Sequence, residues 1–94
     1  MSIGPSPWGS FNAVNITGAS VLKASPGVII RVQVLVAGTT AGAVYDANAA
    51  ANVSQANQVG VIPAVVGTYD IGMPCGTGIV IVPGTSQVLA ASYE

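Results

Sequence analysis

The chain has 94 residues, of which only two are basic and three acidic, so 5% of it is charged and its formal net charge is −1. An average soluble domain is about 25% charged. The length fits one small domain with a modest core. Nucleic-acid binding needs several Lys and Arg side chains acting together, and two basic residues exclude a patch of that kind.

The shortage of charge also predicts how the surface is used. Small soluble monomers usually carry a net charge of magnitude about 2–8 and avoid large apolar patches, whereas this chain has a mean hydropathy of +0.69. The richest apolar run, residues 28–37, is interrupted by Arg31 and Gln33 and is shorter than the ~18 residues that a membrane helix needs. These features favour a subunit that neighbouring proteins cover.

The opening segment, residues 1–11, sets Ile3, Trp8 and Phe11 among Gly, Pro and Ser. It lacks the basic start of a secretory signal, and it predicts an extended arm with aromatic anchors rather than a strand. The rings could fold back over their own domain and close its core. Alternatively, the arm could dock on a partner, because Trp is enriched at the centres of protein interfaces.

In residues 12–94, short Val- and Ile-rich runs are bounded by Gly and Pro, which is the pattern expected of one all-β domain. They predict an antiparallel β-sandwich or jelly-roll-like barrel of about seven to eight strands. The expected strands are residues 13–16, 21–23, 28–37, 42–46, 58–62, 68–71, 78–82 and 87–93. The turn at residues 83–85 predicts a hairpin between the last two strands. Residues 48–57 fit either one or two turns of helix or a surface loop.

The strand at residues 28–37 places its even-numbered aliphatic residues on one face and Ile29, Arg31, Gln33 and Leu35 on the other. Apolar contacts beside an Arg are typical of a protein interface. An ordinary solvent-exposed face, or a pair between Arg31 and Asp46 or Asp70 that fixes strand register, are the alternatives. The candidate interface residues are Trp8, Phe11, Ile29, Arg31, Gln33 and Leu35.

The last strand is apolar or neutral on both faces, with Val88, Ala90 and Ser92 on one of them. Such a strand is either central in its sheet or covered by another subunit.

Groups that could perform catalysis are scarce. There is no His, the commonest general base, and Cys75 has no His that could activate it, so Cys75 is expected to be a small buried hydrophobe. A single cysteine also forms no internal disulfide, which fits assembly in a cytoplasm. Asp46 and Asp70 each follow a tyrosine and fit strand ends with solvated carboxylates. We expect no enzyme and no catalytic, cofactor or metal site.

Residues 21–46 and 62–93 resemble a group of short virion structural proteins of tailed bacteriophages, described as head-fibre, decoration or cement proteins. The resemblance covers about three quarters of the chain, and its elements include Lys23, Gly67, Tyr69, Pro74 and Tyr93. It consists of strand and turn residues without an active-site motif, and the arm lies outside it. It implies an all-β, trimeric protein that binds the major capsid protein on the outside of a phage head assembled in the bacterial cytoplasm.

Two other classes remain open from the sequence. A tail or fibre component could have the same composition. A carbohydrate-binding β-sandwich module would need several exposed aromatic side chains, and the candidates Trp8, Tyr45, Tyr69 and Tyr93 are few and widely spread.

Overall fold

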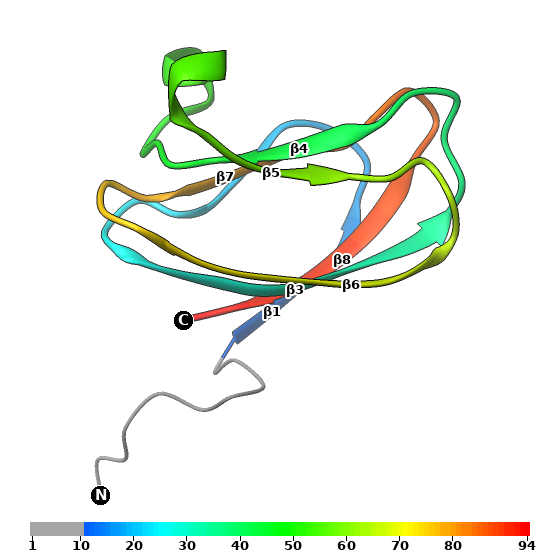
Figure 1. Ribbon diagram of the computed structural model, residues 1–94, viewed down its shortest axis with the longest axis horizontal. Helices are drawn as coiled ribbons and strands as arrows, with labels where there is room; N and C mark the ends of the chain where they lie inside the picture. Colours follow the sequence, from blue (N-terminus) through cyan, green and yellow to red (C-terminus); the bar gives the residue numbers. More distant parts are fainter. Residues whose placement is uncertain (1–10) are drawn as a thin grey trace, which may run out of the picture.

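The Val- and Ile-rich runs form eight strands in the computed structural model, which describes residues 11–94 (Figure 1). The strands are β1 (Phe11–Ile16), β2 (Ser20–Lys23), β3 (Gly27–Val36), β4 (Gly42–Tyr45), β5 (Gln58–Ile62), β6 (Gly67–Cys75), β7 (Ile79–Val82) and β8 (Val88–Tyr93). All eight predicted strands are confirmed. Most of their ends agree within one or two residues, but β6 extends to Cys75 rather than ending at Ile71.

The strands form two antiparallel sheets that pack face to face. The first sheet has the order β1-β8-β3-β6, and the second has the order β2-β7-β4-β5 (Figure 1). The pairs β1–β8, β2–β7, β3–β6 and β4–β5 are nested like one long hairpin, and successive pairs alternate between the sheets. This nesting is the connectivity of a jelly roll, and the predicted all-β sandwich class is confirmed.

The predicted hairpin between the last two strands is wrong. β7 pairs with β2 and β4 in the second sheet, whereas β8 pairs with β1 and β3 in the first. The turn after Val82 therefore carries the chain across the sandwich instead of reversing it within one sheet. Strand β8 is central in its sheet, which confirms the first of the two alternatives for its apolar faces.

The core lies between the two sheets and is aliphatic. Its buried members are Ile16, Ile29, Val32, Val34, Val44, Ile62, Cys75, Ile79, Ile81, Leu89 and Ala91. All strands except β2 contribute buried residues, and within β7 and β8 these alternate along the strand as period-two geometry requires. The predicted burial of Cys75 is confirmed.

Irregular pairing in β3 changes which of its residues face the core. Between Ile29 and Arg31, strand β3 advances two residues while β8 advances one, from Tyr93 to Ser92. The extra residue is a β-bulge, which shifts the alternation by one position. Ile29 is therefore fully buried although Arg31, of the same parity, points outward, so the predicted outward position of Ile29 is wrong.

The connections between strands gather at two ends of the sandwich. We call the end formed by residues 17–19, 37–41, 63–66 and 83–87 the distal end, at the right in Figure 1. The opposite, proximal end contains residues 24–26, 46–57 and 76–78, together with Phe11 and Glu94. Residues 48–57 combine both predicted alternatives, because this surface loop contains two short 3-10 turns, Ala50–Asn52 and Gln55–Asn57.

Candidate interaction surfaces

Arg31 lies in the middle of β3 because it pairs with a carboxylate on the neighbouring strand. Its Nε donates a hydrogen bond to Oδ1 of Asp70 at 2.7 Å, and the two residues are opposite each other in the β3–β6 ladder. The Arg31 side chain is 31% exposed and that of Asp70 76% exposed. An ion pair this exposed contributes little to stability. Opposite charges on directly facing residues favour this register over a shifted one.

The next outward residues of β3 continue the contact with β6. Gln33 Nε2 donates to Thr68 Oγ1 at 3.0 Å, and these residues also face each other in the ladder. Leu35 follows on the same face and is about half exposed. Arg31, Gln33 and Leu35 therefore lie outward as predicted, in an order that changes from charged to polar to apolar toward the distal end.

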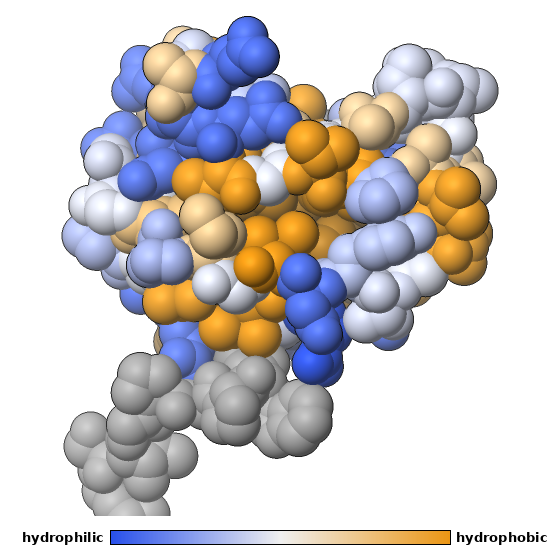
Figure 2. All heavy atoms as spheres, in the orientation of Figure 1, coloured by the Kyte–Doolittle hydropathy of each residue, from blue (hydrophilic) through white to orange (hydrophobic). Residues whose placement is uncertain are grey.

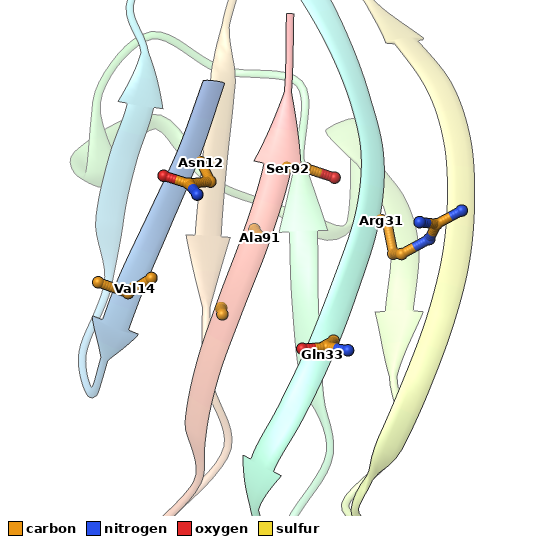
Figure 3. A pocket seen from close by; sticks show the side chains of 7 residues that line it. Asn12, Val14, Arg31, Gln33, Ala91 and Ser92 are labelled. Atoms are coloured by element: carbon orange, nitrogen blue, oxygen red, sulfur yellow. The ribbon is translucent and has the colours of Figure 1, made fainter. Parts of the chain in front are cut away.

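A shallow hollow lies on this outer face of the first sheet, beside Arg31 and Gln33 (Figure 3). Its volume is about 350 Å³, and it is lined by Asn12, Val14, Arg31, Gln33, Ala90, Ala91 and Ser92. Register places Ser92 between Asn12 and Arg31, and Ala90 beside Gln33. Ala90 and Ser92 of β8 thus lie between Asn12 of β1 on one side and β3 on the other.

Sequence reasoning missed Asn12 and Val14 as neighbours of Arg31. Period-two alternation alone puts Val88, Ala90 and Ser92 on one face of the last strand. However, the pairing of β8 with both β1 and β3 joins segments about 50 to 80 residues apart in the sequence, and no local pattern encodes it.

Nine large apolar side chains are exposed among the described residues. Those that are exposed are Phe11, Val14, Val21, Leu35, Val36, Val61, Val65, Val66 and Met73. In Figure 2 the deep blue, hydrophilic atoms lie at the upper left and at the lower centre, whereas the right-hand, distal end is largely white, pale blue and orange. On this face the distal end therefore has few strongly hydrophilic atoms.

Phe11 was predicted to belong to the arm, but it is the first residue of β1 and pairs with Tyr93. Their rings stack with centroids 5.7 Å apart and an interplanar angle of 29°. Phe11 remains more than half exposed. The Phe11 ring therefore packs on Tyr93 at the surface without closing the core, and Trp8 lies outside the described residues.

Asp46 connects two loops at the proximal end. Its carboxylate accepts backbone hydrogen bonds from Gly76 at 3.0 Å, Thr77 at 2.7 Å and Gly78 at 3.3 Å. The bonds from Thr77 and Gly76 are the main reason that the pKa of Asp46 is lowered. Burial, assisted by the charge of Asp46, raises the pKa of the Cys75 thiol. Cys75 therefore stays protonated and unreactive, and Asp46 has a structural role.

We expect Asp46→Asn to lower the thermal unfolding midpoint at pH 7 by several degrees, because three amide groups lose an anionic acceptor. A carboxyl whose pKa is lowered by folding stabilises the protein above its unfolded pKa, and this stabilisation is lost as pH falls through the folded pKa. The difference from wild type should therefore shrink on acidification below pH 4. Thermal unfolding from pH 7 to pH 2 measures this, with Asp70→Asn as the control; a difference that is constant with pH would contradict it.

Within residues 11–94, no three His, Cys, Asp or Glu side chains come together as a metal-binding group. The same residues contain no helix of the length and apolarity required to cross a membrane. Comparisons with protein-family models, with curated proteins and with solved structures found no match to this chain.

Proposed function

We propose that this chain is a non-enzymatic structural protein of a bacteriophage virion. It forms a homotrimer that decorates the outside of the head, binds the major capsid protein and stabilises the shell. The proposal draws on the sequence resemblance described above and on the fold. Jelly rolls are used by viral capsid proteins and also by lectins. The fold alone therefore does not identify the function, and the surface has to distinguish these roles.

The observation that carries the proposal is a jelly roll with almost no surface charge. The chain exposes 4978 Å² and has five charged side chains in total. Two of these, Arg31 and Asp70, pair with each other. Uncharged faces and strand edges tend to associate unless they are covered. In a regular protein shell, neighbouring subunits would cover these faces and edges permanently.

The number of copies in a purified particle tests this proposal. A decoration protein should be present at hundreds of copies per particle and be labelled over the whole head by a specific antibody. A handful of copies at one end would instead identify a tail or fibre component. Absence from particles, together with glycan binding by the isolated chain, would contradict a virion role and favour a lectin-like module.

A further inference from the structure

Polar side chains form a row across the outer face of the first sheet. Cross-strand register places Ser92 of β8 between Asn12 of β1 and Arg31 of β3. Arg31 in turn lies opposite Asp70 of β6, so the row crosses all four strands. None of these four side chains belongs to the core between the sheets. The row therefore lies on the outside of the sandwich.

A second, shorter row runs beside the first. Gln33 of β3 lies between Ala90 of β8 and Thr68 of β6, and its side chain is hydrogen-bonded to that of Thr68. Neighbouring strands are ~4.8 Å apart, and successive outward residues of one strand are ~7 Å apart. The two rows therefore place several hydrogen-bonding groups within a few ångströms of one another on a flat sheet.

The hollow beside Arg31 and Gln33 lies where these rows cross β8 (Figure 3). Ala90 and Ser92 have short side chains, whereas the lining residues on the two flanking strands include Asn12, Arg31 and Gln33, which have longer ones. The volume of about 350 Å³ is within the ~300–1,000 Å³ range of small-molecule sites. The hollow is therefore large enough for a small ligand.

The hydrogen-bonding capacity of the hollow is only partly used by the protein itself. Within residues 11–94, the side chains of Asn12 and Ser92 take part in no hydrogen bond. The Gln33 amide donates one of its two hydrogens to Thr68 at 3.0 Å and has an acceptor oxygen as well. Amide and hydroxyl groups both donate and accept, so the hollow suits a ligand whose own groups do both.

The charge of the hollow narrows the class of ligand. Arg31 is the one charged residue among those that line it, and its Nε is 2.7 Å from Oδ1 of Asp70. An anionic ligand would compete with the Asp70 carboxylate for the guanidinium group, and no lining residue is acidic to attract a cation. These features favour a neutral ligand. An extended peptide would pair with a free strand edge, whereas the hollow lies over β8, which is paired on both sides.

We propose that this hollow binds a neutral saccharide, one or two sugar units in length. Neighbouring sugar hydroxyls match the Asn12, Ser92 and Gln33 side chains, and the exposed Val14 offers apolar contact to the carbon-bound hydrogens of the ring. No lining residue is aromatic. Binding therefore rests on hydrogen bonds and is weak, in the millimolar range for one subunit.

This inference goes beyond the proposed function and adds a condition to it. The outer face of the first sheet has to stay open in the oligomer, so Arg31 and Gln33 face the ligand and not a neighbouring subunit. Several copies held in one oligomer or on one surface would bind a repeating glycan more tightly than a single hollow does.

Titration of the ¹⁵N-labelled chain with maltose, lactose and diacetylchitobiose, followed by amide chemical shifts, tests the inference. Sorbitol, an open-chain polyol, is the control for a general effect of hydroxyl groups. The test variant is Asn12→Ala and the matched control is Asn52→Ala, because both asparagines are exposed and Asn52 lies on the proximal loop. Circular dichroism and thermal unfolding check that both variants remain folded.

The expected result is saturable shifts of the Asn12 and Gln33 side-chain amides with at least one of the three saccharides and not with sorbitol. Asn12→Ala should weaken binding about tenfold, while Asn52→Ala binds like wild type. Because the hollow is neutral overall, binding should be the same at 0.1 M and 1 M NaCl.

The absence of a saturable shift with all three saccharides would overturn the inference, as would equal shifts with sorbitol or equal binding by the two variants. Binding that 1 M NaCl abolishes would overturn the neutral class of ligand. Particle copy number is measured without sugar. A failed titration therefore leaves the proposed virion role standing, and absence of the chain from particles leaves the titration result unchanged.

Discussion

Replacing Gln87 by Ala is expected to destabilise the fold more than any other polar substitution in the described part of the chain. Gln87 is 1% exposed, and its side-chain amide bridges the Pro63 carbonyl and the Gly84 amide. Each buried polar group left without a partner costs about 1–3 kcal/mol, so two cost roughly 2–6 kcal/mol before the cavity is counted. That is a large share of the free energy of unfolding of a typical domain, which is ~5–15 kcal/mol.

Chemical denaturation of Gln87→Ala and of the exposed control Gln33→Ala measures this difference. Gln87→Glu keeps the volume of the side chain, so its free energy of unfolding reports the loss of hydrogen bonds separately from the loss of volume. A buried glutamate has a raised pKa, so its folded form is favoured at low pH, where the protonated carboxyl can donate to Pro63. This variant should be most stable below the unfolded pKa of about 4.3 and lose stability as pH rises through the folded pKa. Equal stability of Gln87→Ala and Gln33→Ala would show that the bridge contributes nothing.

The second large effect is expected from Gly84→Ala. A Cβ at Gly84 would overlap the backbone carbonyl of Thr40 and lie 2.6 Å from its carbonyl carbon. The obstacle is backbone, so a loop at the distal end must move, which costs roughly 1–3 kcal/mol and disturbs the bond to Gln87. The control is Gly18→Ala, since no atom lies within 4 Å of a Cβ there. Thermal unfolding should show a clear loss for Gly84→Ala only, and equal midpoints would refute this packing.

The positions of the strands were predictable because each strand carries its own pattern. Residues such as Gln58–Ile62 combine β-branched side chains with flanking turn residues, and this local information is sufficient. The turn after Val82 contains Pro and Gly but does not reveal whether the chain returns to the same sheet or crosses to the other. That choice depends on β7 pairing with β2 and β8 pairing with β1, which are far apart in the sequence.

The candidate surfaces were only partly predictable for a similar reason. Alternation correctly placed Arg31 and Gln33 outward, because the pairing of β3 with β8 is regular from Arg31 to Val34, and Leu35 is exposed at the next register shift, between Val34 and Val36. It failed at Ile29, since a bulge leaves no recognisable trace in a run of Val and Ile. The pairing of Arg31 with Asp70, rather than with Asp46, depends on the β3–β6 register. The uncharged distal end was not predictable from any one segment, because it joins connections from four parts of the chain.

The two ends of the jelly roll suggest a division of roles. At the proximal end, Asp46 joins two loops through its carboxylate, and the remaining charges lie nearby or midway along the strands. At the distal end, the neutral Gln87 side chain connects two loops by hydrogen bonds to Gly84 and Pro63. A neutral residue there keeps the apolar surface free of a charge that association would have to desolvate.

Sedimentation equilibrium of the purified wild-type chain in dilute solution tests the central claim most directly, which is that this uncharged sandwich is covered by copies of itself. One chain has a mass of 9.2 kDa, so a trimer has three times that value, 27.6 kDa. We expect the trimer mass at micromolar concentration, unchanged between 0.1 M and 1 M NaCl. A single species of 9.2 kDa at all concentrations and both salt levels would contradict the account.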